Sequence, residues 1–169
     1  MRLAPPLLAA LAVPAFAAAD PCLTGTWRGE IAQALPLYQA ISPAPVTSVG
    51  GTVTLVIDAD GAAEGRIDGF RLAIEQGPAT LVNSGEGAFA MDVTADGTDL
   101  SGAMTAFDVT TRARMEAPGA EPVSLAEVRH GLADLPDPGI QTSYVCSNGA
   151  LLLTGAGPAP IPVREWTRE

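Results

Sequence analysis

The amino-acid sequence predicts a mainly β protein, an antiparallel up-and-down barrel or a strongly coiled sheet of about eight or nine strands. Three observations lead to this fold class. Apolar and polar residues alternate along much of the chain, which is the pattern of strands with one buried face. Turn pairs follow several of these runs, namely Asp60-Gly61, Asp96-Gly97 and Asn148-Gly149. Most connections are short, so we expect a meander, with one short helix after the first strand.

The start of the chain has the features of a secretory signal peptide. Met1-Arg2 supplies a positive charge, residues 3–16 are apolar apart from prolines, and Ala17-Ala18-Ala19 supplies a small-residue cleavage site. We therefore expect a bacterial Sec-type leader over residues 1–19. The mature chain would begin at Asp20 and would be periplasmic or secreted.

The mature chain, residues 20–169, is expected to be one soluble domain without a membrane anchor. Asp20-Pro21 directly before Cys22 does not resemble a lipobox, so lipidation is not expected. No later stretch reaches the roughly 18 apolar residues that a transmembrane helix needs.

The charge and the cysteines limit the partners and the chemistry. The chain has 9 basic and 19 acidic residues, and loss of Arg2 with the leader would leave 8 against 19, or −11. Nucleic acids and anionic membranes attract basic surfaces, so neither is expected as a partner. Cys22 and Cys146 are the only cysteines, and in an exported chain we expect them to form a structural disulfide.

In the first half of the mature chain, apolar and polar residues alternate except over one segment that has helical spacing. The first strand contains Trp27 on its core face. Residues 31–41 place apolar side chains three or four apart, as in an amphipathic helix that Pro36 shortens unless it lies in the first turn. Further on, the strand over residues 65–75 changes the parity of its apolar face at Gly69, which indicates a bulge.

The second half contains the clearest strand. We interpret residues 83–87 as a glycine-rich turn and expect one or two helical turns over residues 124–127, which have capping-box spacing. Short strands are expected over residues 142–147, 151–153 and 161–167. The clearest strand has one apolar face, formed by Phe107, Val109, Thr111, Ala113 and Met115.

No catalytic constellation is visible in the sequence. His130 is the only histidine, so a histidine metal cluster is impossible, and a solvated surface position is the simpler interpretation of this residue. Asp58-Ala59-Asp60-Gly61 with Glu64 resembles the opening of a calcium loop but lacks its further ligands, so a hairpin turn is the simpler interpretation. We expect no catalytic residue, no metal and no cofactor.

Two tryptophans stand near the two ends of the mature chain. Arg164 and Arg168 flank Trp166 at the spacing that places all three on one face of the last strand. If the sheet brings the ends together, one of these arginines can lie over the Trp27 ring and close the barrel by a cation–π contact.

These residues carry a resemblance to known families. Gly25-Thr26-Trp27 on the first strand, with an arginine on the last, resembles the Gly-x-Trp and crossing-arginine signature of lipocalins and related calycin barrels. The resemblance implies that Trp27 closes one barrel end and that Arg164 or Arg168 packs across it. The chain also resembles uncharacterised small exported bacterial domains with a Cys-x-x-Gly-Thr-Trp start and a Tyr-x-Cys…Trp-x-Arg finish, here Cys22 to Trp27 and Tyr144 to Arg168.

The sequence leaves two functions open. A barrel of about eight strands can hold one small apolar or amphipathic ligand in the bacterial periplasm, without catalysis. Alternatively, the barrel is filled by its own side chains and the protein is a structural or interaction module of the cell envelope, with another envelope protein as its partner. The candidates for lining a ligand site are Leu55, Phe70, Phe89, Met91, Phe107 and Met115.

Overall fold

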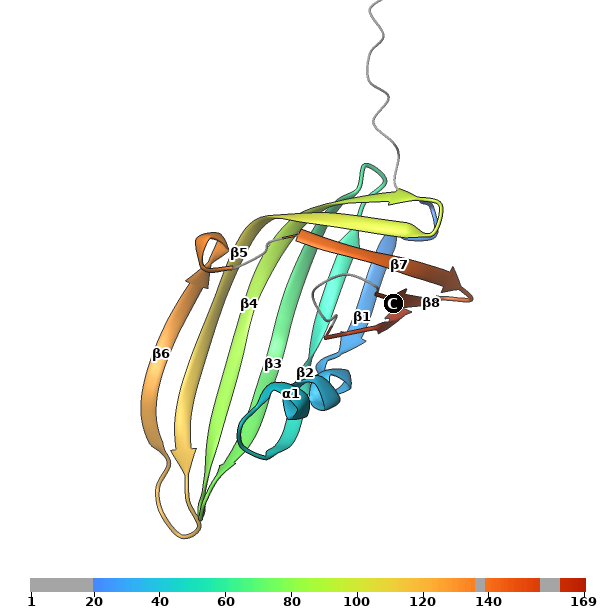
Figure 1. Ribbon diagram of the computed structural model, residues 1–169. Helices are drawn as coiled ribbons and strands as arrows, with labels where there is room; N and C mark the ends of the chain where they lie inside the picture. Colours follow the sequence, from blue (N-terminus) through green and yellow to red (C-terminus); the bar gives the residue numbers. More distant parts are fainter. Residues whose placement is uncertain (1–19, 136–138, 156–161) are drawn as a thin grey trace, which may run out of the picture.

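The computed structural model describes residues 20–135, 139–155 and 162–169 (Figure 1). The expected leader over residues 1–19 lies outside the described residues. Nine strands form one antiparallel sheet that closes nearly into a ring, and one short α-helix follows the first strand, so the predicted fold class is confirmed. The strands are β1 Gly25–Glu30, β2 Val46–Ile57, β3 Ala62–Gln76, β4 Ala79–Asp96, β5 Asp99–Glu116, β6 Val123–Gly131, β7 Gly139–Ser147, β8 Ala150–Thr154 and β9 Glu165–Arg168.

The strand order explains both the ring and its open side. Pairing runs from β1 through β2, β3 and β4 to β5, and returns through β7, β8 and β9 to β1. β5 pairs with β7 over residues 99–103 and with β6 over residues 108–115. β6 is therefore an edge strand attached to the C-terminal half of β5, outside the ring. Figure 1 shows the long strands β3 to β5 extending beyond the short strands β7 to β9 as a curved wall.

The helical segment lies on the concave side of this wall. A 3-10 helix over Ile31–Ala34 leads into α1, Leu35–Ile41, and Pro36 lies in the first turn of α1, where a missing N–H costs nothing. α1 has no buried residue, whereas Ile31 and Ala34 of the 3-10 helix are buried. The Tyr38 ring of α1 lies 6.4 Å from the Phe70 ring of β3, which places the helix over the middle of the sheet.

The glycines of β3 and β4 correct one prediction and support another. The predicted turn over residues 83–87 is wrong, because these residues lie inside β4. A Cβ on Gly87 would lie 2.3 Å from the Asp108 carbonyl oxygen, so glycine permits the close approach of β5 at this position. The predicted bulge is confirmed: the register shifts between Ile67 and Phe70, and Gly69 has a φ of +61°.

Two further predicted elements differ from the structure. Residues 124–127 lie in β6 and form no helix. Pairing with β5 supplies partners for their backbone groups and outweighs the local capping-box spacing that predicted a helix. The last strand begins at Glu165. The N–H groups of Arg164 and Glu165 instead donate to the Gln33 side-chain oxygen, at 3.0 and 2.8 Å.

The hydrophobic core fills the end of the ring where all the short strands meet. Trp27 and Leu23 have no exposed surface, and the Trp27 Nε1–H donates to the Leu23 carbonyl oxygen at 2.7 Å. The core combines residues of β1 to β4 and of β7 to β9 with Leu23 and with Ile31 and Ala34 of the 3-10 helix. The opposite half of the long strands faces α1 and the open side.

Candidate functional site

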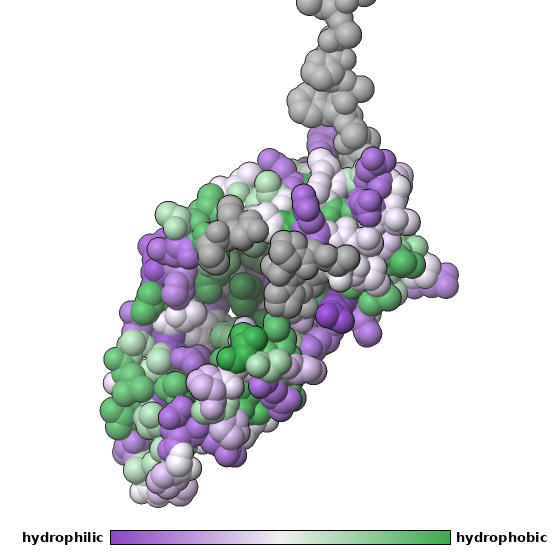
Figure 2. All heavy atoms as spheres, viewed as in Figure 1, coloured by the Kyte–Doolittle hydropathy of each residue, from purple (hydrophilic) through white to green (hydrophobic). Residues whose placement is uncertain are grey.

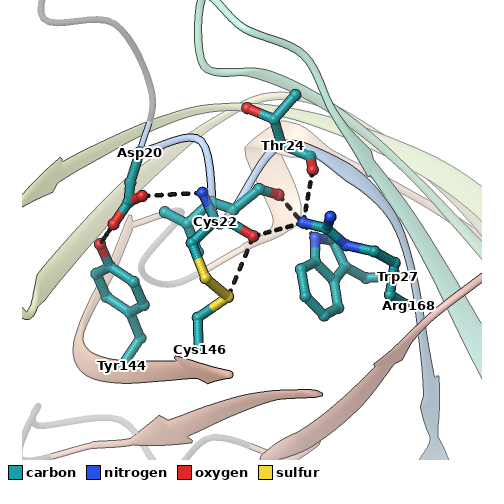
Figure 3. Close-up of a disulfide and its surroundings, with 8 residues drawn as sticks. Asp20, Cys22, Thr24, Trp27, Tyr144, Cys146 and Arg168 are labelled. Carbon is teal, nitrogen blue, oxygen red and sulfur yellow. Dashed lines mark hydrogen bonds between the residues drawn. A yellow bond between two sulfur atoms is a disulfide. The ribbon is translucent and has the colours of Figure 1, made fainter. Parts of the chain in front are cut away.

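A disulfide and an arginine fasten the two ends of the fold together (Figure 3). The predicted disulfide joins Cys22, before β1, to Cys146 in β7. Of the two arginines considered, Arg168 lies over the Trp27 ring, with its guanidinium carbon 4.9 Å from the ring centroid. Its Nη2 also donates to the carbonyl oxygens of Cys22 and Thr24, at 2.7 and 2.9 Å.

Asp20 and Tyr144 form a second link beside the disulfide. The Tyr144 hydroxyl donates to one Asp20 carboxylate oxygen, and the other accepts the Cys22 N–H at 2.9 Å. Burial, and then the neighbouring Asp20 carboxylate, raise the pKa of Tyr144 to about 12. The Tyr144 hydrogen bond and the Cys22 N–H lower the pKa of Asp20. The pair is a structural link, since neither group is free to exchange a proton near neutral pH.

Several of the predicted lining residues meet on one face of the sheet, which we call the inner face. Trp27 pairs with Leu55, Leu55 with Gly65, Gly65 with Phe89, and Phe89 with Phe107. Residues directly opposite in antiparallel strands share a face. One row therefore crosses five strands of the inner face.

Burial falls along this row from the ring end to the open side. Trp27 is fully buried and Leu55 is 9% exposed, whereas Phe89 and Phe107 are half-buried. A Cβ on Gly65 would lie 2.0 Å from the Phe89 ring, so this ring lies directly over the glycine. Phe107 is outside the core cluster although it lies in the middle of the longest strands.

The other predicted lining residues also fall into two groups, those buried in the core and those half-buried on the open side. Met91 is 3% exposed and belongs to the core. Phe70 packs against the core but stays half-buried. Met115 is half-buried at the far end of β5, where it pairs with Leu81 and Val123. Leu55 and Met91 thus fill the ring, while Phe70, Phe89, Phe107 and Met115 line its open side.

The inner face also carries polar groups that the sequence did not single out as ligand contacts. Thr111 Oγ1 lies 2.9 Å from Nε2 of His130, and His130 pairs with Val109 on the same face. His130 is half-buried, so its ring keeps some contact with solvent while it bonds to Thr111. Asn83 lies on this face of β4, opposite Leu72. The sequence signal for these polar groups was Thr111, which is polar although the other residues of its strand face are apolar.

Among the described residues, the outer face has a polar and a more apolar shallow groove. One, of about 640 Å³, is lined by charged groups that already pair, including Arg66 with Asp68 and Arg129 with Asp108. The other, of about 590 Å³, is lined by Val56 and by small and charged residues of β3 to β5, and Phe89 and Phe107 also contribute to its lining. Neither groove brings a nucleophile next to a base.

The described part of the chain has neither a metal-binding cluster nor a membrane-spanning helix. Within residues 20–135, 139–155 and 162–169, no group of three or more His, Cys, Asp or Glu side chains is placed to hold a metal ion. Asp58 Oδ1 accepts the N–H groups of Asp60 and Ala62, each at 2.9 Å, so the supposed calcium-loop residues form the hairpin turn between β2 and β3. No helix in the described part of the chain is long and apolar enough to cross a membrane.

Comparison with known proteins gives no relative. No family model matches the chain, and neither a curated protein nor a solved structure matches it. The resemblance to lipocalins stays a prediction, and function has to be argued from the geometry of the inner face.

Proposed function

We propose that the protein is an exported periplasmic protein that binds one small apolar or amphipathic molecule on the inner face of its lipocalin-like sheet, without catalysis. The observation that carries the proposal is the partial exposure of Phe70, Phe89 and Phe107. These rings lie on the inner face near the middle of long strands, where a filled barrel would bury them.

The lengths of the strands explain why this surface is open. β3, β4 and β5 have 15 to 18 residues, whereas β8 and β9 have 5 and 4. The short strands close only one end of the ring. Figure 2 shows the molecule hollowed on the side where α1 lies, with hydrophobic residues around the hollow.

The composition of the inner face supports a ligand with an apolar body and one polar group. Phe70, Phe107 and Met115 offer apolar contact. The Thr111–His130 pair offers a hydroxyl and an imidazole on β5 and β6, where His130 lies opposite Val109, two residues along β5 from Phe107. A few polar groups in an apolar surface are typical of sites that orient a small molecule.

Export is supported by two features. The apolar leader predicted over residues 1–19 directs secretion. The Cys22–Cys146 disulfide fits an oxidising compartment such as the bacterial periplasm.

The test is titration of the oxidised protein with a neutral, environment-sensitive apolar probe, N-phenyl-1-naphthylamine. We expect saturable fluorescence with one probe per chain. Phe70→Ala removes inner-face contact without changing either outer groove and should weaken probe binding by about tenfold or more. Val56→Ala is the matched control, because Val56 is exposed on the outer face beside the apolar groove there.

Two results would contradict the proposal. One is a fluorescence signal that never saturates. The other is a loss of binding with Val56→Ala and not with Phe70→Ala, which would assign the probe to the outer groove.

One observation favours the structural or interaction module as a second candidate. Trp27, Leu55 and Met91 fill the ring end from within, so part of the interior leaves no space for a ligand. Native mass spectrometry of protein purified from a periplasm separates the two functions. A discrete adduct that is lost on denaturation supports the ligand, and the bare oxidised mass or a complex with an envelope protein supports the module.

A further inference from the structure

β6 has a free backbone edge. It pairs with β5 on one side, and no described strand pairs with its other side. It also exposes apolar side chains, since Val123, Leu125 and Val128 are 59%, 54% and 46% exposed. An exposed edge strand with apolar residues is a template for pairing with another strand.

Two contacts show which backbone groups point outward. Thr111 Oγ1 donates to the Val128 carbonyl oxygen at 3.5 Å, so this carbonyl points toward β5. The Gly131 N–H points away from β5 and donates to Asp134 Oδ2 at 2.7 Å. Backbone groups alternate in an antiparallel strand. The N–H and C=O groups of Glu127 and Arg129 therefore point toward the free edge of β6.

The charges beside this edge form an alternating row on the outer face. Arg112 lies between Glu86, at 3.2 Å, and Glu127, at 2.8 Å. Arg129 pairs with Asp108 through two hydrogen bonds of 2.6 Å. Glu127 and Arg129 are thus opposite charges two residues apart, on one face of an edge strand.

We propose that β6 pairs antiparallel with β6 of a second copy of this chain, centred on Val128. In this register Glu127 lies opposite Arg129 of the second copy, and twofold symmetry repeats the contact. The charge row then reads Glu86, Arg112, Glu127, followed by Arg129 and Asp108 of the second copy. This complementarity selects a second copy over an unrelated strand.

The same geometry limits the strength of the dimer. Leu125 is a bulge, since Ser124 and Ala126 pair with adjacent residues of β5, and the Gly131 N–H is already bonded to Asp134. Only residues 126–130 are left to pair. So short an interface predicts a weak, reversible dimer that depends on protein concentration. The proposal does not rest on ligand binding, although Val128 and His130 of β6 lie on the inner face.

The test is sedimentation velocity of the oxidised protein over a wide concentration range. Wild type should pass from monomer to dimer. Arg129→Glu places carboxylates opposite each other and should raise the dimer dissociation constant at least about tenfold. The double variant Glu127→Arg/Arg129→Glu should restore dimerisation, because opposite charges face each other again between copies although both pairs within the chain are lost.

Arg28→Glu is the control for net charge, since it makes the same charge change on β1, which neighbours neither β5 nor β6 in the sheet, at a side chain that is 46% exposed. Far-UV circular dichroism checks that each variant is folded. A wild type that stays monomeric at the highest concentration overturns the proposal. So does a dimer that Arg129→Glu and Arg28→Glu weaken equally, or one that the double variant does not restore.

Discussion

Arg168 connects the last strand to the first residues of the fold through its side chain. The guanidinium contacts the Trp27 ring and donates to the carbonyl oxygens of Cys22 and Thr24. We predict that Arg168→Ala lowers the free energy of unfolding by about 1–3 kcal/mol, because a charged donor and a cation–π contact are both lost. Urea denaturation of the oxidised protein measures the change.

Arg164→Ala is the matched control for this prediction. Arg164 is exposed, and its hydrogen bonds to the described residues come from its backbone, which alanine keeps: its N–H donates to the Gln33 side chain, and its carbonyl oxygen accepts the Leu153 N–H at 2.8 Å. Its replacement should change the free energy of unfolding by less than about 0.5 kcal/mol. Equal effects of the two substitutions would show that the geometry over Trp27 contributes nothing.

The Tyr144–Asp20 hydrogen bond predicts a specific pH dependence of stability. The pKa of Asp20 is lowered in the folded state, so its contribution is complete above the ordinary value of about 4 and is lost as the pH falls through the lowered pKa. The pKa of Tyr144 is raised to about 12, so its contribution is complete below the ordinary value of about 10 and is lost as the pH rises toward 12.

Tyr144→Phe should therefore reduce the loss of stability in acid and flatten the alkaline decline, as measured by melting temperature against pH. Tyr38→Phe is the control, because burial also raises the pKa of Tyr38 but Tyr38 has no link to Asp20. The two variants should differ in acid. An acid limb that Tyr144→Phe leaves unchanged would contradict the role of Asp20.

At the scale of the strands, glycines set how closely neighbouring chains approach. A Cβ on Gly87 would meet the Asp108 carbonyl oxygen, which cannot move without the strand. A Cβ on Gly65 would meet the far end of the Phe89 ring, which can rotate, and a Cβ on Gly50 would meet nothing within 4 Å. We predict that Gly87→Ala lowers the free energy of unfolding by about 3 kcal/mol or more and Gly65→Ala by about 1–3 kcal/mol. Gly50→Ala should lower it by less than about 0.5 kcal/mol.

Chemical denaturation of the three variants measures this order. Phe89→Ala in the background of Gly65→Ala removes the clash, so the two substitutions together should cost less than the sum of their separate effects. Additive effects would show that the ring does not lie over Gly65 in solution.

Strand by strand, local patterns predicted most of the sheet correctly. Apart from the start of the last strand, they failed at two places. Residues 83–87 contain two glycines, which are as common in turns as in curled strands, and only the approach of β5 decides between them. Residues 124–127 have the spacing of a helix cap, but pairing with β5 supplies their backbone partners. Both errors come from local patterns that non-local pairing overrides.

For the whole molecule, the disulfide is the longest-range constraint. Cys22 and Cys146 are 124 residues apart, and the loop-entropy account of the unfolded chain gives about 4–5 kcal/mol as an upper value for this closure. We predict that the double variant Cys22→Ser/Cys146→Ser has a lower free energy of unfolding than wild type, by a large part of these roughly 4–5 kcal/mol. Urea denaturation measures the loss, and mass after alkylation without reduction should show no free thiol in wild type.

A loss below about 1 kcal/mol would show that the contacts of Arg168 and Tyr144 hold the ends together without the disulfide. Two alkylated cysteines in unreduced wild type would contradict the disulfide itself.

The sequence by itself determined the fold class, the pairing of the two cysteines and the residues that face inward, because alternation, turn chemistry and cysteine count are properties of single segments or of the whole composition. Tertiary structure alone decided that Arg168 and not Arg164 covers Trp27, since both flank Trp166 at equal spacing. It also decided that Leu55 and Met91 are buried while Phe107 stays half-buried. The reason is physical: burial along a strand depends on which other strands reach that level of the ring, and β7 to β9 reach only one end.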